Sequence, residues 1–540
     1  MQPIIKRIFW KRTYLFIEYE STKDINLCLN LFNKDKKGKI KLLENKILLE
    51  TKKLDKNYYR SKINITIAEG REILKSGGYM ISSDEKLCIS NEILLNIEDL
   101  SRVFRYGGWL ESYIVTFHIT EEEPHQLYLY TSYMIDNKHP EKKHLFSSIR
   151  LATGFSHKLK TLIAILGKRC LNIYYQILTH IIPKNGKRIL FLSQNMDHIR
   201  DNMTAVYDRI YERNLDKKYK IRKNFVNIFD GKIRVFYWIK LLTQISYQDY
   251  IFVDDYVPVF SFINLNKKTT LTQLWHAGFG FKLVGYGRFG IAGSPRPYES
   301  CHRQYTYGII GNDHLKEIYS EVWGIEKEAL LATGMPRLEH FLDKEYIKKV
   351  TKSFYDEYPQ FKNKKIITFA PTYRGNSQKE AYYDYSKIDF DALYNFCKKN
   401  DYIVAFGKHH FILQDIPIKK EHSDLIYDMS KYKLNDLLYI TDILITDYSS
   451  CFYDYLLLER PVLFYAYDKD IYSATRGVHR PIDKVAPGKV CTTFDQIMEA
   501  LENKDYGEKE KFDFLVDKCL TNKKIASDQI IDYIILNQRD

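Results

Sequence analysis

The sequence predicts an α/β protein in which a pair of doubly wound Rossmann-type domains follows a small antiparallel β domain. Two observations support this fold class. From residue 188 onward, apolar strand-like runs alternate twice over with helical segments of about 10–15 residues, which indicates parallel sheets built from β–α–β units. Before residue 135, short strand-like runs are separated by turn-formers such as Lys37-Gly38 and Gly77-Gly78, which indicates antiparallel strands.

Length and composition agree with this division. The chain has 540 residues, enough for three or four domains at roughly 150 residues each. Hydrophobic residues make up 45% and charged residues 28%, a globular balance that excludes a mostly disordered chain and a multi-span membrane protein. We expect a β-sandwich-like accessory domain over residues 1–140, a basic amphipathic linker over 141–186, a first doubly wound domain over 187–332 and a second over 333–540 with C-terminal helices.

The charge points to an anionic partner. Lys and Arg number 82 and Asp and Glu 68, so the net charge is 82 − 68 = +14, which suits nucleic acid, a membrane surface or phosphorylated substrates. The eight cysteines form no C-x-x-C pair, which favours a reducing cytoplasm over a disulfide framework or a zinc site. We expect neither a signal peptide nor a spanning helix.

The predicted linker is strongly basic. Residues 142–196 hold ten Lys or Arg residues, no Asp or Glu, and the interleaved apolar runs TLIAIL and LNIYYQIL. A basic amphipathic segment of this kind suits an anionic membrane surface. The alternative is a linker helix that packs its apolar face on the protein.

The segment ILITDYSSCFYDYLLLERPVLFY, residues 443–465, carries the strongest motif. A buried strand ends at Asp447, and Ser449 and Ser450 form the turn before the next helix. Backbone N–H groups and hydroxyls at such a turn predict a phosphate cradle. Asp454 falls on the first turn, where it is placed to accept ribose hydroxyls. The alternative is plain N-capping by the serines.

A histidine ends another predicted strand. In LTQLWHAGFGFKLVGYGRFG, residues 271–290, His276 precedes a glycine-rich turn and Lys282. A histidine at a strand end beside closely approaching backbone suits a general base. A buried structural histidine beside Trp275 is the alternative.

Further cations follow other strand ends. Lys408, His409 and His410 follow the strand DYIVAFG, and because adjacent side chains alternate, at most one of the two histidines should face a cleft. Arg374 ends FAPTYR, unless it is a plain solvent-exposed arginine, and Arg337 lies in TGMPRLEHF at the predicted interdomain crossing.

Asp254 and Asp255 follow the strand IFV. They are either two ligands of a divalent metal, which needs more ligands than this pair, or turn residues.

Together, WHAGFGFK, TGMPRL, FAPTYR, K-x-H and TDYSS resemble the CDP-glycerol glycerophosphotransferase family, whose members build teichoic acids and related capsule polymers. The resemblance covers roughly residues 187–505. It implies a GT-B-like pair of domains, with residues 187–332 on the acceptor side and residues 333–540 binding the CDP donor. It also implies a transferase that moves glycerol phosphate from CDP-glycerol to a hydroxyl of a growing polymer or lipid-linked glycan, releasing CMP.

In that reaction we expect His276 and His410 to be catalytic. The predicted substrate-binding residues are Lys282, Arg337, Arg374, Lys408, Asp447, Ser449, Ser450 and Asp454. We expect no cofactor and no metal, and we expect the protein to lie in the cytoplasm, peripheral on the inner face of the membrane. A glycosyltransferase that uses a nucleotide sugar is the first alternative. A basic nucleic-acid-binding protein is the second, although no helix-turn-helix, RNP or KH pattern supports nucleic acid as a partner.

Overall fold

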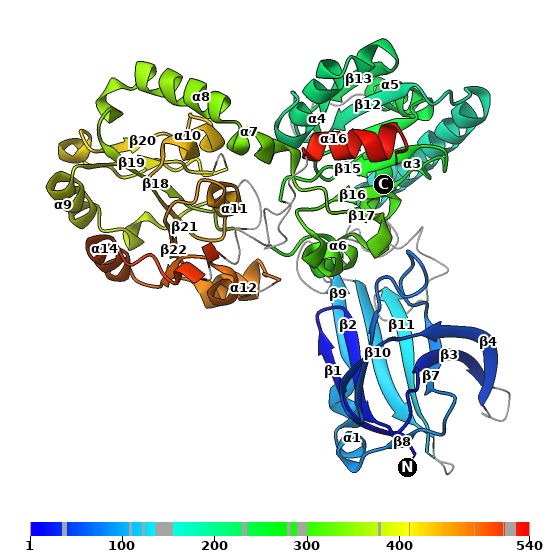
Figure 1. The fold of residues 1–540 in the computed structure, drawn as a ribbon. Helices are drawn as coiled ribbons and strands as arrows, with labels where there is room; N and C mark the ends of the chain where they lie inside the picture. The colour runs from blue at the N-terminus through cyan, green and yellow to red at the C-terminus, as the bar shows by residue number, and fades with distance from the viewer. Residues whose placement is uncertain are drawn as a thin grey trace.

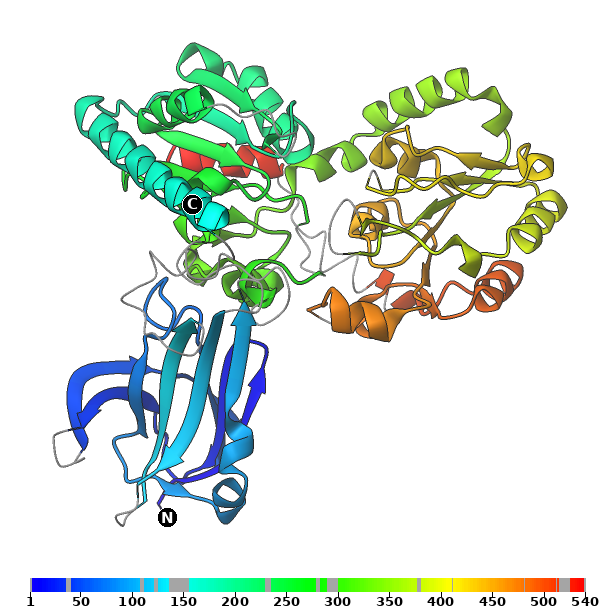
Figure 2. The same cartoon turned by 180° about the vertical axis from the view of Figure 1, so that it is seen from behind.

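The structure of the protein is a computed structural model. It describes residues 2–34, 40–106, 111–120, 125–135, 155–228, 235–277, 282–288, 300–375, 380–409, 411–479, 481–510, 512–513 and 525–538. Figures 1 and 2 show three bodies: a β domain that contains the N-terminus, a first α/β domain above it, and a second α/β domain beside the first.

The β domain is a sandwich of two sheets. Their strand orders are β5-β6-β2-β1-β8 and β4-β3-β7-β11-β10-β9, and the pairings between named strands are antiparallel except β1 with β8. Inward residues of both sheets, such as Ile17 and Leu129, form one core. The strands are β1 (Ile4–Lys11), β2 (Tyr14–Glu20), β3 (Cys28–Lys34), β4 (Ile40–Leu48), β5 (Glu50–Asp55), β6 (Tyr58–Asn64), β7 (Gly77–Ser82), β8 (Cys88–Ile89), β9 (Arg102–Tyr106), β10 (Glu111–Ile119) and β11 (Leu127–Ile135).

Helix α3 (Phe155–Ile181) leads from the β domain into the first α/β domain and lies along its outer side (Figures 1 and 2). Residues 142–154 of the predicted basic linker lie outside the described residues. One face of α3 packs on the domain through the fully buried Tyr175, whose hydroxyl accepts a hydrogen bond from the Asn266 backbone N–H. None of the described helices is long and apolar enough to span a membrane.

The first α/β domain is built on a parallel sheet with strand order β13-β12-β14-β15-β16-β17. Its central strands are almost completely buried, as their continuous apolar sequences predict. The elements are β12 (Arg188–Ser193), α4 (Asp201–Glu212), β13 (Lys220–Phe225), α5 (Val235–Ser246), β14 (Tyr250–Val253), β15 (Thr270–Gln273), β16 (Tyr307–Ile309), α6 (Lys316–Trp323) and β17 (Leu330–Leu331).

The second α/β domain repeats the plan with strand order β20-β19-β18-β21-β22-β23, again parallel. The chain enters it through η10 (Pro336–Leu338) and α7 (Glu339–Leu342). The remaining elements are α8 (Lys344–Glu357), β18 (Lys365–Ala370), α9 (Phe390–Asn400), β19 (Tyr402–Phe406), β20 (Ile426–Asp428), α10 (Leu434–Ile440), β21 (Ile443–Thr446), α11 (Cys451–Leu456), β22 (Val462–Tyr465), α12 (Lys469–Thr475), α13 (Ile482–Val485), β23 (Lys489–Cys491) and α14 (Phe494–Asn503).

The end of the chain corrects one expectation. The predicted division assigns the C-terminal helices to the second domain, but α16 (Ala526–Ile530) and the turn Ile531–Ile535 pack on the first sheet with Ile189 and Phe191. Asp528 pairs with Arg209 and Arg213 of the first domain. After the second domain the chain therefore returns to the first domain, and the apolar side chains of its last helical turns complete that domain's core.

The β domain is attached to the first α/β domain by buried charge. Glu321 on α6 is fully buried and accepts hydrogen bonds from Arg12 at 2.7–3.1 Å and from the Thr13 hydroxyl at 3.1 Å. Arg71 adds an ion pair with Glu326 at 2.8 Å. Because a buried carboxylate needs such partners, this contact fixes the β domain on α6.

Candidate active site

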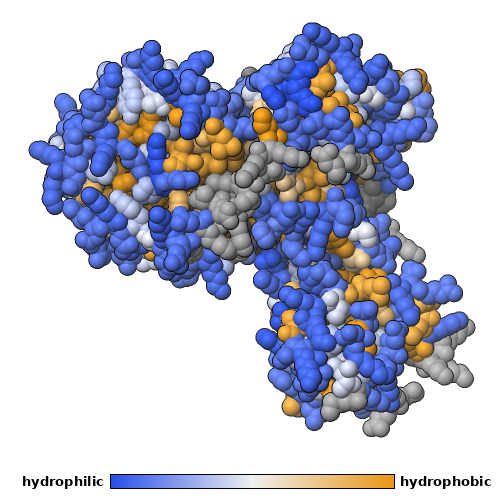
Figure 3. All heavy atoms as spheres, in the orientation of Figure 1, coloured by the Kyte–Doolittle hydropathy of each residue, from blue (hydrophilic) through white to orange (hydrophobic). Residues whose placement is uncertain are grey.

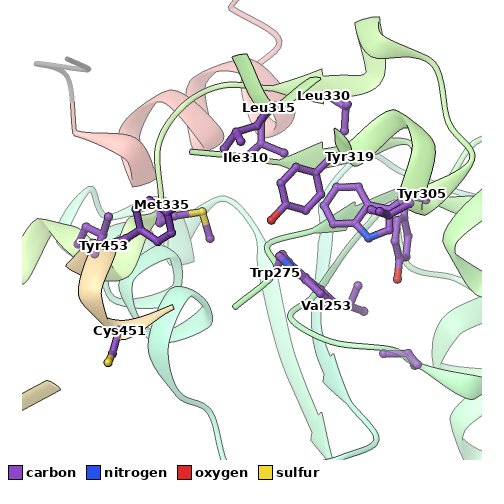
Figure 4. Packing of buried hydrophobic residues seen from close by; sticks show 14 of the residues in the cluster. Val253, Trp275, Tyr305, Ile310, Leu315, Tyr319, Leu330, Met335, Cys451 and Tyr453 are labelled. Carbon is purple, nitrogen blue, oxygen red and sulfur yellow. The ribbon is translucent and has the colours of Figure 1, made fainter. Parts of the chain in front are cut away.

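The predicted site residues follow the carboxyl ends of strands in both parallel sheets, where ligands bind in open α/β folds. His276 follows β15, and Arg374, Lys408 and Asp447 follow β18, β19 and β21. Several of them meet where the two domains touch. Figure 4 shows this junction, with Trp275 and Tyr319 from the first domain and Cys451 and Tyr453 from α11 of the second.

The turn before His276 is strained and firmly held. Trp275 has φ 48°, in the left-handed region that large side chains avoid. Its N–H donates to the Gln273 side chain at 2.9 Å, and its carbonyl accepts from Asn202 Nδ2. The Tyr319 hydroxyl donates to the carbonyl of Ala277. These contacts fix the direction in which His276 leaves the strand.

The surroundings of His276 select one tautomer. Its Nδ1 lies 3.3 Å from the backbone oxygen of Asp254. A carbonyl oxygen only accepts hydrogen bonds, so Nδ1 carries the proton and Nε2 is left as a basic acceptor. The imidazole is half-buried, and this arrangement supports the general-base role that the sequence predicts.

A buried carboxylate accompanies this histidine. Asp254 is 5% exposed, and its Oδ1 has no hydrogen-bond partner. Burial and the neighbouring Asp255 raise the pKa of Asp254 to about 6, while Arg200 and His276 oppose the rise. The alternative of a metal pair has less support, because Asp255 Oδ1 accepts the Tyr256 N–H at 2.6 Å as a turn residue does.

Arg337 and Asp454, both predicted to bind substrate, bind each other. The guanidinium donates to the two carboxylate oxygens at 3.0 and 2.8 Å, and both side chains are buried. Arg337 also donates to the backbone oxygen of His276, and its own N–H donates to Asn202 Oδ1 at 2.9 Å. The pair joins α11 to the catalytic turn, and in this arrangement both Asp454 oxygens are occupied.

Arg374 and Asp447 are also paired. Arg374 donates to Asp447 at 2.5 Å and to both oxygens of Asp468 at 2.8 and 2.9 Å. Arg374 is 6% exposed, which excludes the alternative that it is a solvent-exposed arginine. Its guanidinium lies 5.1–5.5 Å from the ring centroids of four tyrosines: Tyr383, Tyr448, Tyr467 and Tyr472. Asp447 accepts the Thr372 N–H at 2.9 Å, so this network fixes the loops that surround Ser449 and Ser450.

Lys282 lies closer to the second domain than its place in the sequence suggests. Its backbone pairs with Val478, and the adjacent Leu283 N–H donates to the Gly477 carbonyl at 3.1 Å. Only glycine fits at position 477, because its φ is +76° and a Cβ would lie 2.3 Å from the Leu283 side chain. Lys282, predicted to lie in the acceptor-side domain, is thus brought to the second α/β domain.

The ammonium of Lys282 joins a cationic group. Burial lowers the pKa of Lys282 to about 8, and Arg476 and Arg374 contribute to the fall while Asp447 opposes it. Arg476 donates to the Gly375 carbonyl at 3.1 Å and to the Tyr373 hydroxyl at 2.8 Å. Among the described residues no carboxylate pairs with Arg476. Lys282 and Arg476 are therefore the cations best placed for an anionic ligand.

The serine turn lies in the same region. Ser449 and Ser450 are half-buried. Ser449 Oγ accepts the Cys451 N–H at 3.3 Å, as the capping alternative predicts, whereas the Ser450 side chain makes no capping hydrogen bond. The Ser450 hydroxyl is consequently the better candidate for a phosphate oxygen.

The third strand end departs from expectation. Lys408 donates to the Gln414 carbonyl at 2.8 Å and lies 3.8 Å from Asp428, so its ammonium has protein partners. The ring of His409 packs on Tyr373. His410, predicted to be catalytic, lies outside the described residues.

Over the described ranges, one group of three side chains is spaced for a metal ion: Asp391, Glu421 and His422. Lys419 already contacts Asp391 there at 2.6 Å. Sequence patterns point to neither this group nor Asn202. Asn202 is the buried hub between the Trp275 carbonyl and the Arg337 N–H, and it stands inside an ordinary amphipathic helix.

A half-buried histidine whose Nε2 is an acceptor, half-buried cations and a serine turn at the junction of two parallel sheets suit a transferase that uses an activated phosphate donor. Comparison with known proteins agrees. Residues 173–536 match the family described as CDP-Glycerol:Poly(glycerophosphate) glycerophosphotransferase, and the chain belongs to this family of phosphotransferases.

Its relatives include the teichoic acid ribitol-phosphate polymerase TarL of Staphylococcus aureus, 30% identical over 94% of each chain. The teichoic acid poly(ribitol-phosphate) polymerase of Bacillus spizizenii is 34% identical over 67% of this chain and 58% of that protein. Among solved structures, the wall teichoic acid polymerase TagF has the same fold over 74% of this chain and 98% of its own, with a TM-score of 0.54 at 21% identity.

Proposed function

We propose that this enzyme transfers a polyol phosphate from a CDP-activated polyol to a terminal hydroxyl of a growing teichoic-acid-like polymer and releases CMP, using the two α/β domains as a GT-B-like pair. The observation that carries this proposal is the tautomer of His276, which leaves Nε2 as a hydrogen-bond acceptor on the first domain. With it come the cations Lys282 and Arg476, where the first domain meets the second.

In the proposed reaction His276 Nε2 takes the proton of the acceptor hydroxyl. The hydroxyl oxygen then bonds to the phosphorus that carries the polyol, and the bond from that phosphorus to the bridging oxygen breaks. CMP leaves with the electron pair. Lys282, Arg476 and the Ser450 hydroxyl stabilise the charge on the phosphates, which is the main contribution a protein makes to phosphoryl transfer.

The polyol is the finer part of the proposal. CDP-glycerol is the donor that the sequence motifs imply, and the family description contains glycerophosphate. The two enzymes compared above are ribitol-phosphate polymerases by name, which supports CDP-ribitol as the competing donor. Both carry the diphosphate that the cations would bind.

A donor panel tests the function. The purified protein is incubated with CDP-glycerol, CDP-ribitol, a UDP-sugar and a CMP-sugar, each with an oligomeric polyol-phosphate acceptor, and nucleotide release is followed. We expect CMP from one or both CDP-polyols. Release from a nucleotide sugar alone would favour the glycosyltransferase alternative. A protein that releases no nucleotide but retains nucleic acid in a salt-dependent way would favour the nucleic-acid alternative.

We also propose that α3 attaches the protein to the inner face of the cytoplasmic membrane, where a lipid-linked acceptor would lie. Six apolar side chains of α3 recur at the spacing of one helix face and are 47–68% exposed: Leu159, Ile163, Leu166, Ile173, Ile177 and Ile181. The surrounding segment carries ten cations and no acid. A second copy of the chain would oppose like charges, so an anionic lipid surface is the better partner.

A further inference from the structure

The second sheet of the β domain has an unusual outer face. In β11, Leu127, Leu129 and Tyr133 point into the sandwich core, so the alternate residues Tyr128 and Tyr130 point outward. The register places further outward residues beside them. We call the following set the aromatic face: Phe32 and Lys34 on β3, Met80 on β7, His118 on β10, and Tyr128 and Tyr130 on β11.

The rings of the aromatic face pack on one another. His118 stacks on Tyr128 with centroids 5.4 Å apart, and Tyr128 contacts Tyr130 at 5.6 Å. Phe32 and Tyr130 close over Gly78, where a Cβ atom would lie 2.5 and 2.7 Å from their rings. Phe32, Met80 and Tyr128 pack on one another as a small buried cluster, so the accessible part of the face consists of Lys34, His118 and Tyr130. An outer sheet face is ordinarily polar, and this one is aromatic and basic.

The charge of this face is positive. Lys34 Nζ lies 5.4 and 5.7 Å from the ring centroids of Tyr128 and Tyr130. Lys46 pairs with Asn30 across β4 and β3, and Arg105 pairs with Ser112 across β9 and β10, so both fall on the same side of the sheet. Within the described part of the sheet, strand alternation places one acid on this side, Glu44, in the irregular stretch of β4 between Leu42 and Lys46, so the cations outnumber it. Figure 3 shows hydrophobic surface between hydrophilic residues on this domain.

We propose that the aromatic face binds the growing polyol-phosphate polymer at a distance from the catalytic junction. This inference rests on the proposed function. The rings of His118 and Tyr130 suit the C–H groups of a polyol, and the hydroxyl of Tyr130 suits its oxygens. Lys34, Lys46 and Arg105 suit its phosphates. Strands lie about 4.8 Å apart, so the step from β9 to β3 spans about 19 Å, enough for several polymer units.

The placement of the β domain supports this occupant. Arg12 and Glu321 fix the β domain on α6, within the same α/β domain that carries His276 (Figure 1). The first α/β domain therefore holds both the junction and the β domain, so a long polymer is the acceptor that we expect to contact both places. The face should raise affinity for long acceptors alone.

The experiment uses the full-length protein with a long poly(polyol phosphate) and with a short oligomer of the same unit. The variants are Lys34→Ala and Tyr130→Ala. The control is Lys53→Ala, which removes an exposed lysine placed 5.2 Å from the Tyr59 ring on the other sheet. Calorimetry should show Kd for the long polymer rising about fivefold to tenfold in both variants but not in the control. Turnover with the short oligomer should stay at the parent value.

An unchanged Kd for the long polymer in Lys34→Ala, an exposed position whose loss leaves the core intact, would overturn the proposal. So would variants that lose binding to anionic vesicles while keeping polymer affinity, because the face would then be a membrane contact. Failure of the proposed function is separable: a parent protein that transfers nothing to the short oligomer can still be tested for polymer binding by calorimetry.

Discussion

At the scale of single residues, hydrogen bonds to backbone groups orient His276. The Asp254 carbonyl sets its tautomer, Asn202 and Gln273 hold the strained Trp275, and Arg337 donates to the His276 carbonyl. A residue in the left-handed region persists only where its neighbours over-determine it. Strained residues cluster at functional sites, so the strain at Trp275 supports the role that we propose for His276.

The first prediction concerns this histidine. His276→Ala removes the group that accepts the hydroxyl proton, so we expect turnover to fall by roughly 10²–10⁴ while donor affinity changes little. Steady-state CMP release and donor calorimetry measure the two effects. His198→Ala, a surface histidine of the same domain that pairs with Asp197, is the control. Near-parental turnover in folded His276→Ala would remove the base from the mechanism.

The second prediction concerns pH. We propose that the ammonium form of Lys282 binds the donor diphosphate, and burial lowers the pKa of Lys282 to about 8. As pH rises through this value the free enzyme loses the charge, so donor Kd should rise above about pH 8, approaching tenfold per pH unit for one proton. Lys282→Arg keeps its charge and should flatten the profile. A parent Kd that is constant between about pH 7 and pH 9.5 would contradict the assignment.

The sequence identifies these strand-end residues because strand ends and turns are local patterns. It does not reveal their partners. In FAPTYR, Arg374 has no acidic neighbour, yet its guanidinium donates to Asp468, which lies 94 residues away in the sequence. Asn202 bonds to residues 73 and 135 positions away. Such contacts depend on tertiary geometry, which no short window of sequence contains.

At the scale of elements, helix α11 of the second domain makes a buried contact with the first domain. Its Asp454 reaches the crossing element η10 through Arg337, and its first residue, Cys451, is buried at the junction seen in Figure 4. The buried strand of this unit is predictable from the run ILIT, and its turn from Asp-Tyr-Ser-Ser. The ion pair between Arg337 and Asp454 is not predictable, because the sequence is equally consistent with both residues binding a ligand.

The third prediction tests this ion pair. Asp454→Leu leaves the Arg337 guanidinium buried without its partner, so we expect the free energy of unfolding to fall by about 3–5 kcal/mol. The double variant Arg337→Met with Asp454→Leu removes both charges and should recover much of that loss.

Urea unfolding of the parent, both single variants and the double variant gives the coupling energy. Turnover should stay low in the double variant, because the Arg337 contact with the His276 carbonyl is lost. If the double variant is as unstable as the sum of the singles, the pair contributes no coupling, and if its turnover is parental, it does not position the base.

At the scale of the whole molecule, three bodies are tied by a few long-range contacts. The alternating pattern predicts both parallel sheets and the β domain, because hydrophobic period and turn chemistry are local. The return of α16 to the first domain is not predictable, since an amphipathic helix fits either sheet equally well. The same limit applies to α3, where packing decides which of two apolar faces is buried.

Helix α3 gives the last prediction. Tyr175 buries one face, and the exposed stripe from Leu159 to Ile181 on the other would insert into the lipid interface, while Lys and Arg side chains meet anionic headgroups at about 1 kcal/mol each. Attachment of this kind weakens as salt screens the charges. We expect the protein to sediment with anionic vesicles at low ionic strength and to be released, at least in part, near about 1 M salt, where the Debye length is about 3 Å.

Neutralising Lys158, Lys160, Lys168 and Arg169 to Gln should release it at lower salt. The matched control neutralises four exposed lysines of α8 in the second domain, Lys344, Lys348, Lys349 and Lys352, and so makes the same change in net charge. Equal release of both quadruple variants would show that overall charge, not α3, attracts the protein. Parental sedimentation of the α3 variant would leave the helix as a packed linker, and salt-resistant pairing of chains without vesicles would show that a second copy covers the stripe.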